Sequence, residues 1–291
     1  MIPLQRLKIY IQLMRLDKPI GILLLLWPML WGLWFAAEGF PDVMILGIFV
    51  IGTILMRSAG CVINDYADRE IDLHVERTKN RPFATQSAGT REALFLAAGL
   101  SLCAFILILP LNQLTITLSF VALFLAGTYP FTKRFFAMPQ AYLGIAFSFG
   151  IPMAFAAQTN ELPMLVWILM IANLFWVIAY DTAYAMVDKV GDLKIGIRTS
   201  AITFGQFDVM GVILCHIIFL SLMLYIGFFQ QMGIAYYAGL ITATGLIIYQ
   251  YQLIKNRDPK YCFQAFLNNN WVGTVIFIGI ALDFLITPTY K

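Results

Sequence analysis

The chain consists of long apolar runs separated by shorter polar segments, beginning at about residue 19. A run of about 20 apolar residues gives a helix long enough to cross the hydrocarbon core of a bilayer. Nine such runs predict nine transmembrane helices, at roughly 19–37, 43–64, 93–111, 114–131, 137–158, 162–181, 207–229, 232–254 and 267–287. The pattern predicts an all-α membrane protein, with a single domain over residues 1–291.

The composition supports this prediction. Of 291 residues, 60% are hydrophobic and only 12% are charged. A soluble domain has roughly a quarter charged residues and cannot bury so much apolar surface. The composition therefore excludes the soluble classes.

Lysine and arginine are concentrated on one side of the predicted topology. All but Arg57 and Lys291 of the 19 lie before the first span or after spans two, four, six and eight. By the positive-inside rule this side faces the cytoplasm. We therefore expect a multi-pass protein of the inner (cytoplasmic) membrane with a cytoplasmic N-terminus. Within residues 1–18, apolar residues recur near helical spacing among basic ones, which predicts a cytoplasmic interfacial segment.

A polar cluster overlaps the end of the second span, in Arg57-Ser-Ala-Gly-Cys-Val-Ile-Asn64-Asp65-Tyr-Ala-Asp68-Arg-Glu-Ile-Asp72. On an α-helix, Asn64, Asp68 and Asp72 share one face, and Arg57 lies two turns earlier on nearly the same face. Neighbouring carboxylates repel one another unless a cation lies between them, and oxygen-only ligands suit Mg2+ better than zinc. The spacing therefore predicts a Mg2+ site.

A second cluster repeats the spacing of the first, in Asp181-Thr-Ala-Tyr-Ala-Met-Val-Asp188-Lys-Val-Gly-Asp192. Its acids stand at positions i, i+7 and i+11, as do Arg57, Asn64 and Asp68 of the earlier cluster. Two solvated loops at helix ends are the alternative explanation. The matching spacing favours two related halves, each with an acidic mouth.

Charges deep in the predicted spans are few. An intramembrane charge costs about 2.5 to 3.5 kcal/mol and so usually marks function. Here the deep charges are Arg57, Asp181 and, near the opposite end of the last span, Asp283, which is expected at the interface on the far side. Because no ladder of ionisable groups crosses the membrane, a secondary transporter or channel is the less favoured class.

The polar mouth above an aromatic-rich interior suits an amphiphile with a phosphorylated head and an isoprenoid or acyl tail. Two Mg2+ ions could bridge to a diphosphate, whose departure from an allylic carbon leaves a carbocation that aromatic faces can stabilise. Lipid-facing packing accounts for most of the aromatic residues. Five nearby cations could contact phosphate directly, namely Lys133, Arg77, Lys189, Lys194 and Arg198.

Several motifs together carry a family resemblance. They are Arg15-Leu-Asp17-Lys18-Pro19-Ile-Gly, the stretch from Met56 to Asp72, Arg77-Thr-Lys-Asn-Arg81-Pro82, Tyr129-Pro-Phe-Thr-Lys133-Arg134, and Tyr180 to Asp192. In these motifs, and over essentially its whole length, the chain resembles the intramembrane aromatic prenyltransferases of the UbiA superfamily. It is most similar to the bacterial 4-hydroxybenzoate polyprenyltransferases of ubiquinone biosynthesis.

The resemblance implies a nine-helix bundle around a central cavity that opens to the cytoplasmic side and laterally to lipid. Acidic cap loops would cover the cavity at about residues 65–92 and 182–206. The implied reaction is Mg2+-dependent transfer of a polyprenyl group from polyprenyl diphosphate to the carbon ortho to the hydroxyl of 4-hydroxybenzoate. Neither a nucleic acid nor an obligate protein partner is implied.

The resemblance also assigns roles to residues. The implied metal ligands are Asn64, Asp68, Asp72, Asp188 and Asp192. The implied diphosphate contacts are Arg15, Lys133, Arg134, Arg77 and Lys194. Asp181, Tyr129 and Asp188 are expected at the reacting centre, and Tyr184 fits either a catalytic role or a wall position.

Arg57 is expected to bind the carboxylate of 4-hydroxybenzoate. A buried guanidinium without a partner is costly, so we expect an anion to form an ion pair with it. An acid on the same or a neighbouring helix is the alternative partner. Within the superfamily, acceptors such as homogentisate, naphthoate or haem are the runners-up, and a haem acceptor offers no benzoate that needs a buried arginine.

Overall fold

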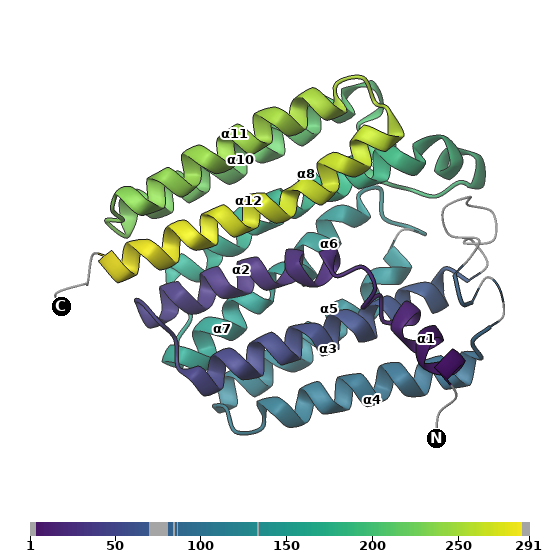
Figure 1. Cartoon of the computed structure of the whole chain (residues 1–291), viewed down its shortest axis with the longest axis horizontal. Coiled ribbons are helices and arrows are strands. Elements are labelled where there is room, and N and C mark those ends of the chain that lie inside the picture. The colour runs from purple at the N-terminus through teal and green to yellow at the C-terminus, as the bar shows by residue number, and fades with distance from the viewer. Residues whose placement is uncertain (1–3, 70–80, 84, 86, 133, 287–291) are drawn as a thin grey trace.

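The computed structural model describes residues 4–69, 81–83, 85, 87–132 and 134–286, and every regular element in these ranges is a helix (Figure 1). The helices are α1 (Leu4–Leu13), α2 (Ile20–Ala37), α3 (Val43–Ala67), α4 (Thr90–Ile108), α5 (Gln113–Thr132), α6 (Pro139–Ser148), α7 (Gly150–Thr159), α8 (Met164–Ile195), α9 (Ser200–Thr203), η2 (Gly205–Phe207, a 3-10 helix), α10 (Asp208–Phe229), α11 (Ile234–Ile254) and α12 (Pro259–Ile286). The expected all-α class is confirmed.

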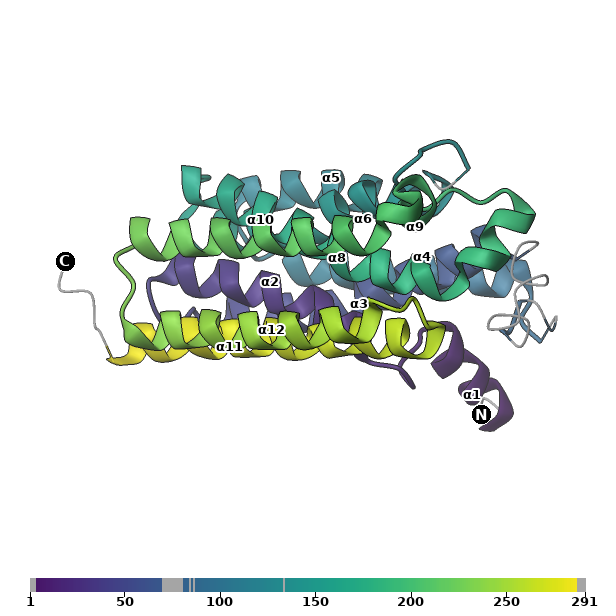
Figure 2. The same ribbon diagram turned by 90° about the horizontal axis from the view of Figure 1, so that it is seen from above.

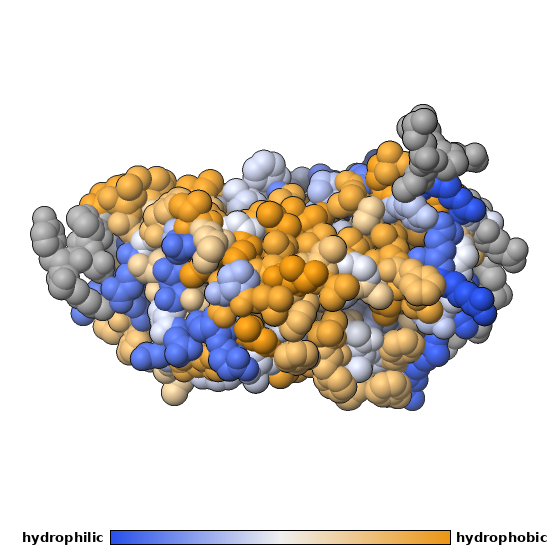
Figure 3. Space-filling view, turned by 90° about the horizontal axis from the view of Figure 1, so that it is seen from below, coloured by the Kyte–Doolittle hydropathy of each residue, from blue (hydrophilic) through white to orange (hydrophobic). Residues whose placement is uncertain are grey.

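The long helices form a bundle whose members run nearly along the longest axis of the molecule (Figures 1 and 2). In the described part of the chain, eight helical segments are long and apolar enough to cross a membrane. The eighth expected span, 232–254, also forms a helix, α11, but tyrosine, glutamine and threonine make its sequence less apolar. The count of nine spans therefore stays a prediction. Figure 3 shows apolar residues across the middle of one face and hydrophilic residues gathered toward its two ends.

The expected span 137–158 is interrupted. Helix α6 ends at Ser148 and α7 begins at Gly150, with Phe149 between them. Pro152 has no backbone N–H, so it cannot donate to the carbonyl of Ser148 four residues earlier. The proline therefore accounts for the break at this point of an otherwise continuous apolar run.

The core lies where α2, α8 and α10 meet. The rings of Trp31 and Trp176 are 5.2 Å apart, and Phe219 packs against both, at 6.1 and 5.7 Å between centroids. The Trp176 indole also donates a hydrogen bond of 2.9 Å to Asn269 of α12, which satisfies its buried N–H. This stack fixes the middle of α8, the helix that carries the second acidic cluster.

Asp283, which we expected at the membrane interface on the far side, is buried by protein near the C-terminal end of α12, and its depth in the bilayer stays a prediction. It lies in α12 with only 4% of its surface exposed, and its carboxylate accepts hydrogen bonds from the backbone N–H groups of Gly233 (2.6 Å) and Tyr236 (3.2 Å). These N–H groups belong to the first turn of α11, where no intrahelical acceptor is available. Asp283 therefore caps a neighbouring helix, which explains a charge inside an apolar span.

The N-terminal segment forms α1, which lies beside the end of the bundle where α3 finishes (Figure 1). The hydroxyl of Tyr10 donates a 2.5 Å hydrogen bond to Glu92 of α4, and this bond to the carboxylate raises the pKa of Tyr10. Arg6 lies 3.3 Å from the same carboxylate. These contacts attach α1 to the N-terminus of α4, near the polar mouth.

Candidate active site

A cavity of about 1000 Å³ opens among the helices and contains both polar clusters. Its polar part is lined by residues from the α1–α2 connection, the C-terminal half of α3 and α8, whereas α2, the N-terminal half of α3, α4, α5 and α7 supply apolar lining. The apolar lining includes Leu24, Met29, Phe49, Phe105, Phe120 and Met153. A cavity with one charged end and one apolar end has the shape that an amphiphile requires.

The first cluster lies at the C-terminal end of α3. Asn64 and Asp68 both line the cavity, and the Asn64 amide donates a 3.3 Å hydrogen bond to the Asp68 carboxylate. The spacing of four residues brings them onto one face, as predicted. Asp68 is the residue at which α3 ends. Asp72, the third member of the predicted set, lies outside the described residues.

The second cluster lies on α8, which continues as one helix to Ile195. Asp181, Asp188 and Asp192 all line the same cavity as the first cluster. We had expected a cap loop from about residue 182, and this boundary is wrong. Residues 182–195 contain no proline, so the helix ends only at Gly196, whose φ of 72° is left-handed. The acids therefore stand on a helix instead of a loop.

The part of the chain that the structure describes forms no compact all-protein metal cage. Within the described ranges, no group of three or more His, Cys, Asp or Glu side chains is close enough to hold a metal ion. Mg2+ is usually held by one or two carboxylates together with substrate phosphates and water, not by a complete set of protein ligands. The pairs Asn64–Asp68 and Asp188–Asp192, each one helical turn apart and facing the cavity, supply oxygen donors of that kind.

Asp65 organises the basic residues at the mouth. It is 1% exposed, and its Oδ1 lies 2.5 Å from Arg15 and 3.1 Å from Arg81. Burial works against the charge of Arg15, but the nearby Asp65 carboxylate raises the pKa of Arg15 above its ordinary value. All three residues line the cavity. The sequence had assigned Arg15 to the diphosphate and had given no role to Asp65 or Arg81.

Two of the predicted diphosphate contacts do not reach the cavity. Lys194 is exposed in the last turn of α8, about 200° around the helix from Asp192. Arg134 is also exposed, and its guanidinium donates a 2.8 Å hydrogen bond to the carbonyl of Ala67, the last residue of α3. Lys133 and Arg77 lie outside the described residues.

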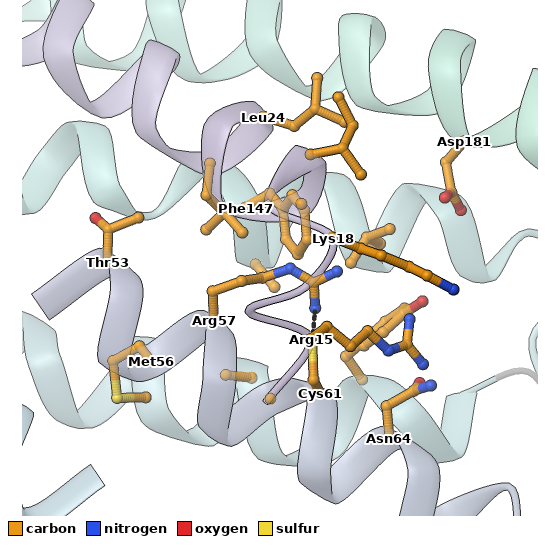
Figure 4. Close-up of a pocket in the computed structure, with 18 of the residues that line it drawn as sticks. Arg15, Lys18, Leu24, Thr53, Met56, Arg57, Cys61, Asn64, Phe147 and Asp181 are labelled. Carbon is orange, nitrogen blue, oxygen red and sulfur yellow. Dashed lines mark hydrogen bonds between the residues drawn. The ribbon is translucent and has the colours of Figure 1, made fainter. Parts of the chain in front are cut away.

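Arg57 lies deeper, between the two clusters and the apolar part of the cavity (Figure 4). Its Nη1 is 2.8 Å from Sγ of Cys61, and its guanidinium carbon lies 6.0 Å from the centre of the Phe147 ring. Its Nε is buried without a hydrogen-bond partner. Among the described residues no carboxylate forms an ion pair with Arg57. An internal acid partner, which the sequence had left open, is therefore not found in this part of the chain.

The remaining predicted residues surround the same space. Tyr129 of α5 and Asp181 of α8 line the cavity, and Asp181 faces the region between Arg57 and Lys18 in Figure 4. Tyr184 also lines it, with its ring 4.5 Å from that of Phe266 in α12. Aromatic and carboxylate groups thus lie beside the only arginine that the described spans bring this deep. Such surroundings can stabilise a cation formed in the cavity.

The fold and the cavity define a multi-pass α-helical membrane protein with an acidic, phosphate-compatible site at one end of its bundle. The model of the UbiA prenyltransferase family matches residues 25–273. A 4-hydroxybenzoate octaprenyltransferase from Nitrosospira multiformis is 72% identical over 282 residues, which cover 97% of each chain. The chain therefore belongs to the UbiA prenyltransferase family, and is an enzyme of the prenyltransferase class.

Solved structures of the same fold agree with the helix arrangement. The apo structure of a UbiA homolog from Aeropyrum pernix K1 superposes with a TM-score of 0.79 at 23% identity, covering 90% of this chain and 97% of that one. A UbiA homolog from Archaeoglobus fulgidus bound to GPP and Mg2+ gives a TM-score of 0.69 at 16% identity, covering 96% and 100%. At these identities the likeness establishes the fold.

Proposed function

We propose that this protein transfers an octaprenyl group from octaprenyl diphosphate to the carbon ortho to the hydroxyl of 4-hydroxybenzoate, in a Mg2+-dependent reaction of ubiquinone biosynthesis. The name of the relative from Nitrosospira multiformis supports the two substrates. The observation that carries the proposal is Arg57: a half-buried guanidinium whose Nε is buried and which forms no ion pair with a described carboxylate, in a cavity that also holds the pairs Asn64–Asp68 and Asp188–Asp192. An aromatic carboxylate supplies the missing anion.

Two polar rows, Asn64–Asp68 at the end of α3 and Asp188–Asp192 on α8, bind the diphosphate end of the donor. Asn64 and Asp68 on one helix, and Asp188 and Asp192 on the other, provide the oxygen donors for Mg2+, with Asp72 proposed to complete the first set. When bound, Mg2+ supplies positive charge that neutralises the diphosphate and favours its departure. We propose that Arg15 contacts the diphosphate directly, together with Lys133 and Arg77.

Chemistry follows at the boundary between the polar and apolar parts. The allylic C–O bond breaks, and Asp181, Tyr129 and neighbouring rings face the positive charge that develops on the carbon. Arg57 holds the carboxylate of 4-hydroxybenzoate, which orients the ring so that the carbon ortho to the hydroxyl reaches that carbon. The new C–C bond forms, and the ring then loses its proton to restore aromaticity.

The cation distribution supports a location in the inner membrane with the polar mouth at the cytoplasmic face. The water-soluble acceptor would then reach the site from the cytoplasm, and the diphosphate group of the donor would lie at the same face. The apolar part of the cavity would receive the tail, which is long enough to extend into the lipid.

The test is transfer of octaprenyl to labelled 4-hydroxybenzoate by the purified protein in lipid. We expect a lipid-soluble labelled product with Mg2+ and none with excess EDTA. The same assay with homogentisate or a naphthoate in place of 4-hydroxybenzoate shows which of these candidate acceptors the enzyme uses. A wild-type protein that binds octaprenyl diphosphate but forms no Mg2+-dependent product from 4-hydroxybenzoate contradicts the proposal.

Arg57→Ala provides the matching variant. It removes the proposed carboxylate contact, so we expect the KM for 4-hydroxybenzoate to rise about a hundredfold, while binding of the diphosphate donor is retained. Equal losses for donor and acceptor would refute the assignment of Arg57.

A further inference from the structure

Gly21 packs directly against the guanidinium of Arg57. It is the second residue of α2 and is buried. A Cβ placed on Gly21 would lie 2.4 Å from Nη2, 2.5 Å from Nε and 2.8 Å from the central carbon of the Arg57 guanidinium. Non-bonded carbon atoms prefer separations of about 3.5 to 4.0 Å. The guanidinium therefore occupies the volume that a side chain at position 21 would need.

Two further described neighbours of this guanidinium, Cys61 and Phe147, are uncharged. Cys61 accepts from Nη1 at 2.8 Å, and the Phe147 ring lies 6.0 Å from the central carbon. Nε is buried without a partner, and it is one of the three atoms nearest to the position of the missing Cβ. Close fit against α2, together with one weak bond to sulfur, holds the group in place. The charge of the guanidinium can therefore interact with a ligand at the Nη atoms.

We propose that Gly21 is a specificity-determining residue, which selects a carboxylate-bearing aromatic acceptor by letting the Arg57 guanidinium lie flat against α2. Any larger residue would push the guanidinium toward the cavity and out of line with the acceptor carboxylate. The inference rests on the proposed function. It makes Gly21 a positioning residue that acts through Arg57 and does not itself touch the reacting atoms.

The principal test is Gly21→Ala. The added methyl group conflicts with the far end of a flexible side chain and not with backbone, so the helix can still pack and the arginine moves instead. A displaced charged hydrogen bond predicts a rise of about tenfold or more in the KM for 4-hydroxybenzoate. The KM for octaprenyl diphosphate is expected to stay the same. The preference for 4-hydroxybenzoate over the uncharged 4-hydroxybenzamide should fall by the same factor.

Gly47→Ala is the matched control. Gly47 lies on α3, the same helix as Arg57, has nothing within 4 Å of its added Cβ and does not line the cavity. We expect it to leave both KM values unchanged. The double variant Gly21→Ala with Arg57→Ala tests the route of the effect. If Gly21 acts through Arg57, adding Gly21→Ala to Arg57→Ala changes the acceptor KM no further.

Binding of 4-hydroxybenzoate to the protein is measured by titration calorimetry alongside transfer. Wild-type protein that binds the acid without transferring octaprenyl counts against the proposed function, whereas the Gly21→Ala shift in binding tests the role of Gly21 separately. An unchanged acceptor affinity in Gly21→Ala overturns the inference. Equal weakening of donor and acceptor, or full additivity in the double variant, overturns it as well.

Discussion

Helices α3 and α8 present the same spacing of polar residues to one cavity with different charges. Arg57, Asn64 and Asp68 on α3 correspond in spacing to Asp181, Asp188 and Asp192 on α8, and all six line the cavity. Where α8 has an acid at each position, α3 has a cation, an amide and an acid. The repeated spacing thus brings both sets to one cavity, and under the proposed function the differences between them would separate recognition of an anionic acceptor from binding of the diphosphate.

The two helices are also held in different ways. Helix α3 ends at the mouth, where Arg15 and Arg81 converge on its buried Asp65. Helix α8 runs on beyond that point, and its Lys189 lies 2.6 Å from Asp208, a fully buried acid that Arg257 contacts at 2.8 Å. In both cases one buried carboxylate gathers two cations from other segments. The support of the α3 row borders the cavity, because Arg15, Asp65 and Arg81 all line it, whereas Lys189, Asp208 and Arg257 lie outside the cavity lining.

The largest expected effect comes from Asp188 on α8, which stands where α3 has the amide of Asn64. Asp188→Asn keeps the shape but removes a proposed metal ligand, so we expect kcat/KM to fall about a thousandfold and more Mg2+ to be needed for half-maximal activity. Asn64→Asp, the reciprocal change on α3, should cost far less because it adds a carboxylate. The measurement is the Mg2+ dependence of transfer. Equal losses in the two variants would mean that the rows are equivalent.

A second comparison concerns Asp181 and Arg57, the first positions of the two repeated patterns. Asp181→Asn should lower kcat about a hundredfold for every acceptor, because its charge faces the cation that develops on the donor. Arg57→Ala should act on the KM of the acceptor instead. Steady-state kinetics with 4-hydroxybenzoate and with 4-hydroxybenzamide distinguish the two patterns. The comparison fails if Asp181→Asn changes only the acceptor KM.

The anchoring carboxylates should affect stability more than chemistry. Asp65→Asn and Asp208→Asn each leave two partly exposed cations beside a neutral amide, and we expect a loss of about 1–3 kcal/mol in unfolding free energy. Thermal unfolding in detergent should shift down by several degrees in both. Asp65→Asn should in addition weaken donor binding, since Arg15 and Arg81 line the cavity. Unaltered melting of both variants would show that neither acid anchors its helix.

The smallest effect is expected at Lys194. Although the sequence assigned it to the diphosphate, its side chain is exposed and lies outside the cavity lining. Lys194→Ala should therefore change kcat/KM by no more than about twofold. A large loss of donor affinity would show that the end of α8 bends toward the cavity when substrate binds.

The helices themselves could be predicted because apolar runs are a local property of the chain. Their ends were harder to predict. Hydropathy falls after Asp181, yet α8 continues to Ile195 because the next fourteen residues still favour a helix. Similarly, nothing in the hydropathy of residues 137–158 marks the break at Phe149, which depends on the proline three residues later.

The cavity-facing acids followed from helical periodicity, but their supports did not. Asp65 follows Asn64 directly in the sequence, and its turn of about 100° points it away from the row and toward Arg15 and Arg81. Asp283 caps a helix about fifty residues earlier in the chain. Pairings between distant segments leave no periodic trace, so only the folded chain reveals them. Tail length had also stayed open, because a cavity open to lipid does not measure it.

The unanswered charge of Arg57 has a consequence for the lifetime of the protein itself. The guanidinium is half-buried against a glycine, a thiol and a phenyl ring, and an acid that pairs with it would bind the native fold alone. Ligand at a hundred times its Kd adds about 2.7 kcal/mol to folding stability by mass action. Under the proposed function, binding of the aromatic acid would stabilise the fold, and the protein should resist heat and proteolysis best when this substrate is abundant.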